Sequence, residues 1–169
     1  MTATFQKAMD YDGGEYGTAL LFAGDAVATR TIALPGDGGE ARAAAMVTLR
    51  SPSGAPFTVV SLHIDHQSAE RRRKQMAVLL ATLPADQPAL LCGDFNATAN
   101  EAQAMLPQWK HLPKSADPAT FPANAPKEEI DHVFARATSS IRWSVGDHRV
   151  VAEPVASDHR PILLVAGWQ

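Results

Sequence analysis

The strongest limit on the fold is a series of short apolar segments at both ends of the chain with one helical segment between them. Residues rich in Val, Leu, Ile and Phe, bounded by turn residues, predict strands over 16–23, 43–50, 57–64, 89–95, 130–136, 141–151 and 161–165. Apolar residues recur at helical spacing from Ala69 to Leu83 behind Ser68, a suitable N-cap, and a shorter helix is expected over 100–109. Strands with intervening helices predict an α/β or α+β layered domain in which helices cover sheet faces.

The size of the chain favours one domain. It has 169 residues, of which 46% are hydrophobic, enough to bury one core. We expect a single domain over residues 16–169, preceded by a segment over 1–15 that is either flexible or exchanged between protomers. No apolar stretch approaches the ~20 residues of a membrane span, and the first ten residues lack the apolar core of a secretory signal, so a soluble chain is expected.

Charge and cysteine content narrow the partners and the compartment. The net charge of −3 and the pI near 6.0 provide no general attraction to nucleic acid, although a local basic patch stays open. Cys92 is the only cysteine, so the chain cannot form an internal disulfide, and we expect a cytoplasmic location. The surroundings of Cys92 in the sequence do not favour structural zinc.

Two apolar strands end in polar side chains suited to chemistry. Asp94 and Asn96 follow the segment that begins at Ala89, and strand periodicity puts both on one face. Asp94 could ligate a metal or accept a proton and Asn96 could bind an oxyanion, although turn formation explains both residues equally well. The strand ending at His63 delivers that residue together with Asp65 and His66, which are also potential metal ligands.

The C-terminal part supplies the partner for a catalytic histidine. Asp131 lies in a strand between apolar neighbours, and a buried carboxylate needs a partner. Asp158 and His159 come just before the last strand. Because a carboxylate that accepts from a His ring nitrogen fixes its tautomer and stabilises the imidazolium, Asp131 and His159 are the candidate pair.

The polar groups at these four strand ends contain carboxylates, His and Asn. The sequence has no nucleophile elbow, phosphate-binding Gly loop or dinucleotide fingerprint. Activated water is therefore the natural nucleophile. Carboxylate and amide oxygens suit Mg²⁺ or Mn²⁺, with Ca²⁺ as a further candidate, and such an ion would neutralise a substrate phosphate.

Ordered short motifs give the chain a resemblance to the endonuclease/exonuclease/phosphatase superfamily, typified by deoxyribonuclease I. The motifs are Leu62-His63, Gly93-Asp94-Phe95-Asn96, Ile130-Asp131 and Ser157-Asp158-His159-Arg160-Pro161. Tyr16-Gly17-Thr18-Ala19 resembles a further strand motif in which Thr18 replaces the usual Asn, and the likeness covers about residues 11 to 166. Each motif is weak alone, but the ordered set is specific.

The resemblance implies an α/β fold, a four-layered sandwich with helices outside two central sheets, here N-terminally truncated. It also implies roles for the residues at the strand ends. Asp94 would position or deprotonate water, Asn96 would contact phosphate, and His63 would be the second catalytic His. His159, oriented by Asp131, would contact the scissile phosphate or transfer a proton. The implied metal ligands are Asp94, Asn96 and Asp158.

The start of the chain departs from the family pattern. Family members open with an Asn-bearing strand, a helix and a strand that ends in a Leu-Gln-Glu-Val-like motif, whose Glu is a principal metal ligand; this sequence has none of them. Asp10, Asp12 and Glu15 are the only acids ahead of the first matching strand and are the candidates to replace it. Without a replacement, metal affinity and turnover should fall.

Two functions follow from these observations. The first is a divalent-metal-dependent phosphoesterase, a phosphodiesterase or phosphatase, whose substrate is a small molecule, a phospholipid head group or, less favoured by the charge, a nucleic acid. The second is a weakly active or non-catalytic remnant that acts as an oligomeric interaction module. In both cases the missing strands should leave an unpaired sheet edge, which predicts a homodimer or higher homo-oligomer.

Overall fold

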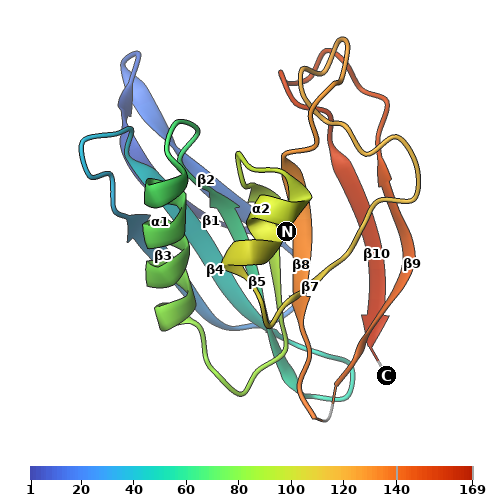
Figure 1. Cartoon of the computed structure of the whole chain (residues 1–169). Helices are drawn as coiled ribbons and strands as arrows, with labels where there is room; N and C mark the ends of the chain where they lie inside the picture. The colour runs from blue at the N-terminus through green and yellow to red at the C-terminus, as the bar shows by residue number, and fades with distance from the viewer. Residues whose placement is uncertain (140, 169) are drawn as a thin grey trace.

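The computed structural model describes residues 1–139 and 141–168 and has a six-stranded sheet at its centre (Figure 1). The strand order in this sheet is β3-β4-β5-β6-β8-β7, and β5 and β6 are parallel while the other neighbours are antiparallel. These strands span Ala26–Leu34 (β3), Arg42–Arg50 (β4), Pro56–His63 (β5), Ala89–Asp94 (β6), Lys110–His111 (β7) and Asp131–Arg136 (β8).

Two antiparallel pairs form separate small sheets. β1 (Thr2–Tyr11) pairs with β2 (Gly14–Phe22), and β9 (Trp143–Val150) pairs with β10 (Ile162–Trp168). The β1–β2 pair packs against β3, β4 and β5, whereas apolar residues of β9 and β10 pack against β6 and β8. The helices α1 (Ala69–Thr82) and α2 (Ala99–Met105) lie on the other side of the large sheet (Figure 1).

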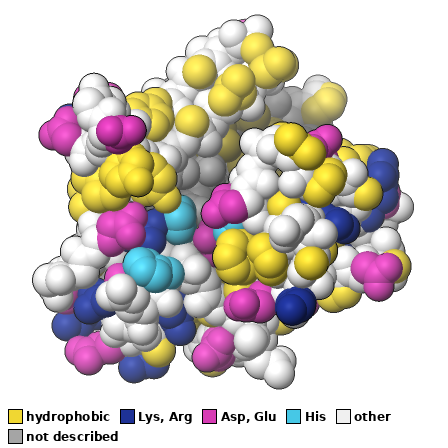
Figure 2. Space-filling view, turned by 90° about the horizontal axis from the view of Figure 1, so that it is seen from above, with side chains coloured by type: hydrophobic (Ala, Val, Ile, Leu, Met, Phe, Trp, Pro, Cys, Tyr) yellow, Lys and Arg dark blue, Asp and Glu magenta, His cyan; other side chains and the backbone are white. Residues whose placement is uncertain are grey.

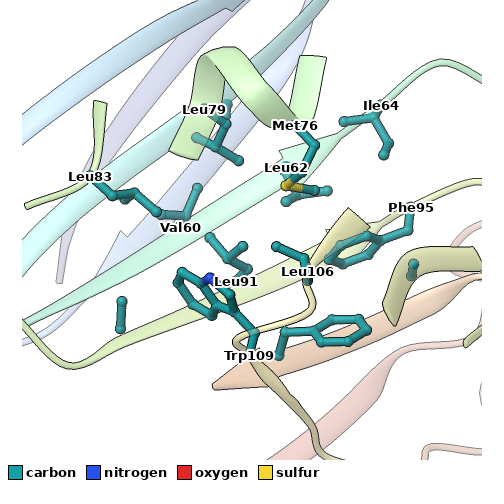
Figure 3. Packing of buried hydrophobic residues seen from close by; sticks show 14 of the residues in the cluster. Val60, Leu62, Ile64, Met76, Leu79, Leu83, Leu91, Phe95, Leu106 and Trp109 are labelled. Atoms are coloured by element: carbon teal, nitrogen blue, oxygen red, sulfur yellow. The ribbon is translucent and has the colours of Figure 1, made fainter. Parts of the chain in front are cut away.

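The main core lies between the large sheet and the two helices. Val60 and Leu62 of β5 and Leu91 of β6 alternate with less buried residues, so their side chains share one face of the sheet. Figure 3 shows them against Met76 and Leu79 of α1. The helical spacing of the apolar residues predicted one apolar stripe on α1, and this contact buries it.

The first helix begins at its predicted cap, whereas the second begins one residue earlier than expected and ends early. Ser68 caps α1 by accepting from the backbone N–H of Arg71, and Thr98 forms a capping box with Glu101 at the start of α2. The expected helix over 100–109 instead runs from Ala99 to Met105. Pro107 is the physical reason, because a proline disfavours helical backbone at the residue before it.

Three strands were not predicted from the sequence, namely β1, β3 and the two-residue β7. Most of β3 is exposed and consists of small and polar residues, so it lacks the apolar alternation of a half-buried strand. The segment 1–15 contains β1, which pairs with β2 of the same chain from Thr2 opposite Phe22 to Tyr11 opposite Gly14. Asp10 and Glu15 at this hairpin both pair with Lys7.

The α/β layered domain expected from the sequence is confirmed. The layer opposite the helices consists of the separate β1–β2 and β9–β10 pairs. Within residues 1–139 and 141–168, both helices lie on the other face of the large sheet. No helix in this part of the chain is long and apolar enough to cross a membrane.

Candidate active site

Strand register brings three of the predicted site residues into one row. His63 ends β5 and is the partner of Asp94 at the end of β6, and Asp94 is in turn the partner of Asp131 at the start of β8. Because residues directly opposite each other in a sheet project to the same face, the three side chains lie side by side. His159 joins them from the segment that precedes β10.

Asp94 is the centre of this group. Its Oδ2 lies 3.3 Å from Nε2 of His63 and 3.9 Å from Nε2 of His159. The Nδ1 atom of His159 lies 2.8 Å from Oδ2 of Asp131, which also accepts from the Thr120 hydroxyl at 2.5 Å. The arrangement is therefore a carboxylate between two imidazoles, one of which is oriented by a second carboxylate.

Burial sets the protonation of Asp94 and His63, the inner pair of the row. It raises the pKa of Asp94 to about 6, aided by the charge of Asp131. It also lowers the pKa of His63 to about 4, and the guanidinium of Arg42 acts in the same direction. His63 is therefore neutral at pH 7, so its contact with Asp94 is a polar contact between a neutral ring and a carboxylate.

His159 and Asp131, the outer pair of the row, have pKa shifts of the opposite sign. The hydrogen bond to Asp131 raises the pKa of His159 against the effect of partial burial. Burial alone would raise the pKa of Asp131, but the hydrogen bonds from His159 and Thr120 outweigh it and lower the value. Asp131 thus favours the imidazolium form of His159 and holds its Nδ1–H, which leaves Nε2 directed towards Asp94.

The Gly93-Asp94-Phe95-Asn96 sequence explains why Asp94 is held so closely. Gly93 has φ 138° and passes the carbonyl of Leu62 so closely that a β carbon would lie 2.0 Å from its oxygen. Phe95 is fully buried and anchors the turn. Asn96, with φ 46°, donates its backbone N–H to Asp94 Oδ1 at 2.7 Å and its amide to the carbonyl of Ile64 at 2.9 Å.

A groove opens beside this row between the two small sheets. Its lining includes Cys92, Gly93, Asp131 and His159 at the site and the apolar residue Leu20 of β2. Figure 2 shows His and acidic side chains next to a hollow between the two halves of the molecule. A substrate group can therefore reach Asp131 and His159 from solvent.

Comparison with known proteins identifies the family of the chain. The sequence model of the Endonuclease/Exonuclease/phosphatase family matches residues 4–159. The chain belongs to this family. Comparison with curated protein sequences gave no significant match.

Solved structures share the fold at low sequence identity. A functionally unknown conserved protein from Enterococcus faecalis V583 is 24% identical with a TM-score of 0.82, over 99% of this chain and 77% of that one. The human nocturnin catalytic domain, solved with a bound sulfate, is 22% identical with a TM-score of 0.78, over 99% and 72%. A mannosyl-6-phosphatase from Bacteroides thetaiotaomicron is 19% identical with a TM-score of 0.74, over 98% and 77%. Members of the family are generally phosphoester hydrolases.

The structure adds Arg42 and Tyr16 to the residues expected from the sequence. Arg42 is buried, and its Nη1 lies 2.7 Å from Nε2 of His63. The Tyr16 hydroxyl lies 3.0 Å from Nδ1 of the same ring, and Glu40 pairs with the other end of the guanidinium at 3.2 Å. The strand register could have indicated Arg42, because β4 runs antiparallel to β5 and starts where His63 ends it.

Several candidate residues lie outside the row, among them Asp65, His66 and Asp158. Asp65 is fully buried, and it accepts from Arg71 and from the backbone N–H groups of Gln67 and Ser68 at the start of α1. His66 contacts Arg42 Nη2 at 2.9 Å. The side chain of Asp158 is exposed and accepts from the hydroxyl of Ser157.

The donor atoms at this edge are chemically suited to the divalent metal that enzymes of this family usually use. Asp94 Oδ2 faces the two imidazoles, and the amide nitrogen of Asn96 is already used, which leaves its carbonyl oxygen for a ligand. Hard oxygen donors of this kind suit Mg²⁺ or Mn²⁺. Since Asp131 is occupied by His159 and Thr120, the row leaves a metal only the carboxylate of Asp94, which itself accepts from the backbone of Asn96, and we expect weak metal affinity.

Proposed function

We propose that the chain is a divalent-metal-dependent phosphoester hydrolase that uses water as its nucleophile. The observation that carries this proposal is the position of Asp94 between the Nε2 atoms of His63 and His159, with His159 held by Asp131. Without a metal, burial raises the pKa of Asp94 to about 6, and a carboxylate of this kind is suited to accept a proton close to neutral pH.

The proton transfers of the proposed step use groups in this row. The oxygen of a water molecule attacks phosphorus while Asp94 takes its proton, and the bond between phosphorus and the leaving oxygen breaks. His159, kept as an imidazolium by Asp131, donates a hydrogen bond to the phosphate or its proton to the leaving oxygen. Asn96 contacts the phosphate, and His63 is the second histidine beside it.

Positive charge is the other requirement of phosphoryl transfer. Asp94 and Asn96 would hold Mg²⁺ or Mn²⁺, which would neutralise charge on the phosphate when bound. The exposed side chain of Asp158 would have to turn towards the ion to serve as a further ligand. The buried guanidinium of Arg42 supplies a fixed positive charge beside His63, and we propose that it shares this task. It favours phosphate binding in a site with few carboxylates.

Small phosphoesters are the substrates that we favour. The net charge of −3 gives no general attraction to nucleic acid. The groove beside Asp131 has apolar walls at Leu20 and Val59, which suit the body of a small organic molecule. The fold of a mannosyl-6-phosphatase is similar to this one, which supports a phosphomonoester as the first substrate to assay.

A hydrolysis assay tests the proposal. Sugar phosphates, bis-aryl phosphodiesters, phospholipid head groups and single-stranded DNA are offered with Mg²⁺ or Mn²⁺ and then with excess chelator. We expect turnover that the metal restores and that Asp94→Asn removes. Turnover that is unchanged in chelator would contradict the metal-dependent mechanism. Absence of turnover on every substrate class would favour the alternative, a non-catalytic interaction module.

We further propose that the chain forms a homodimer or higher homo-oligomer. In the described residues, β2 is paired only with β1 and β10 only with β9, so each has an open edge. Exposed apolar side chains lie on the same strands, among them Leu21 at 65% and Val165 at 54%. Open edges with apolar side chains recruit further strands. Sedimentation equilibrium at micromolar concentration tests this, and a stable 18.0 kDa monomer is the result against it.

A further inference from the structure

We propose that His111, Glu129 and His132 form a second metal site, for a transition-metal ion of the Zn²⁺ class. Each of the three offers a ligand atom, and these atoms all lie within 4.8 Å of one another. Asp131 and His132 are consecutive in β8, so their side chains point to opposite faces of the sheet. This site therefore lies across the sheet from the row at Asp94 and goes beyond the proposed hydrolysis.

His132 is already arranged as a metal ligand. Its ring is fully buried, and Nε2 lies 2.9 Å from the carbonyl oxygen of Ala97, which can only accept. Nε2 must therefore carry the proton, and Nδ1 is left with a lone pair. That lone pair is buried without a hydrogen-bond partner and lies 3.8 Å from Oε1 of Glu129. Histidines that bind metals commonly donate their other ring N–H to a backbone carbonyl in this way.

His111 supplies the second imidazole from the neighbouring strand. Its ring lies 5.1 Å from that of His132, and its Nε2 is also buried without a partner. Two unsatisfied buried ring nitrogens facing one carboxylate are costly in an empty site, and a cation satisfies both.

The donor set selects the class of metal. Two imidazoles and one carboxylate suit Zn²⁺ and related ions, unlike the oxygen donors at Asp94. Zn–N distances of about 2.0–2.1 Å in a tetrahedral site place ligand atoms about 3.3 Å apart, so the side chains need to close by roughly 1.5 Å at most. Glu129 also lines an open pocket with Thr98 and Ala99, which gives an ion and a water ligand access.

Lys114 competes for the same carboxylate. Its buried ammonium lies 2.8 Å from Oε1 of Glu129 and donates to the carbonyl oxygen of Asp131 at 2.7 Å. The ion must share Glu129 with this charge, which weakens binding. Lys114→Met removes the competitor and should tighten metal binding, whereas Glu129→Gln removes the ligand and should weaken it. A role of these residues in packing alone does not predict opposite signs.

Cobalt absorption is the test, because Co²⁺ replaces Zn²⁺ and its d–d bands report imidazole coordination independently of any activity. The intact chain is titrated with Co²⁺ alongside His111→Gln and Glu129→Gln, with Asp94→Asn and His66→Gln as controls. We expect the bands in the intact chain and in both controls, and displacement by Zn²⁺. Affinity should fall at least 10–100-fold in the two ligand variants, as much as loss of an outer-shell partner costs.

Three results would overturn the site. They are no bands in the intact chain, equal affinity in the ligand variants, and loss of the bands in Asp94→Asn. Glu129 is partly exposed and its amide is isosteric, so Glu129→Gln should fold, and circular dichroism checks this. None of these outcomes affects the hydrolysis assay, so failure of this site leaves the proposed phosphoesterase unchanged.

Discussion

Gly93→Ala should destabilise the chain far more than an alanine at another glycine with positive φ. A β carbon at Gly93 would lie 2.0 Å from the carbonyl oxygen of Leu62 and 3.1 Å from its nitrogen. Both atoms belong to the backbone of β5 in the middle of the large sheet, so no side-chain rotation relieves the contact. The strands must separate where His63 and Asp94 meet.

The expected loss of stability in Gly93→Ala has two parts. A φ of 138° is strained for any residue with a β carbon, which costs about 1–3 kcal/mol. Forcing packed strands apart costs about another 1–3 kcal/mol. Together they give about 2–6 kcal/mol, a large part of the roughly 5–15 kcal/mol that stabilises a typical domain.

Gly54→Ala is the matched control. Gly54 also has positive φ, 87°, but nothing lies within 4 Å of the position of its β carbon. It should show the backbone strain alone, about 1–2 kcal/mol. Urea unfolding at neutral pH measures both variants. Equal losses would mean that the contact with Leu62 contributes nothing and would refute the account of how the two strands hold Asp94.

Further substitutions address the row itself. Asp94→Ala, Asp158→Ala or His159→Ala should each lower hydrolysis by roughly 10²-fold or more while circular dichroism stays unchanged, and full activity in all three would exclude the proposed site. His66→Ala should cost less activity than His63→Ala, as steady-state kinetics can measure. The pKa shifts of Asp94 and His63 predict opposite effects of pH on the free energy of unfolding. The raised pKa of Asp94 makes the free energy of unfolding fall as the pH rises from about 4 to 6. The lowered pKa of His63 makes the free energy of unfolding increase between about pH 4 and pH 6.5. Asp94→Asn leaves only the effect of His63. In urea titrations, the free energy of unfolding of this variant should therefore rise more steeply with pH over this range than that of the intact chain. An equal slope in the two proteins would contradict the burial argument.

Local patterns in the sequence were sufficient for much of the fold. The apolar alternation of β5 and β6 and the helical spacing of α1 each describe burial of one face, which depends on a few neighbouring residues. Ser68 as N-cap is a local signal of the same kind. β3 was not predicted because an exposed strand has no such alternation of apolar residues. Its pairing with β4 is what stabilises it.

The residue types of the candidate active site could also be predicted from the sequence, since Asp94, Asp131 and His159 stand in short motifs with a chemical reason for each. Their arrangement could not be, because it depends on the register between strands far apart in the chain. The same holds for Arg42, which reaches His63 across β4 and β5. Contacts between distant segments follow from which strands pair and in which register, and no local pattern in the sequence encodes that pairing. Only the tertiary structure therefore decided which side chains surround Asp94.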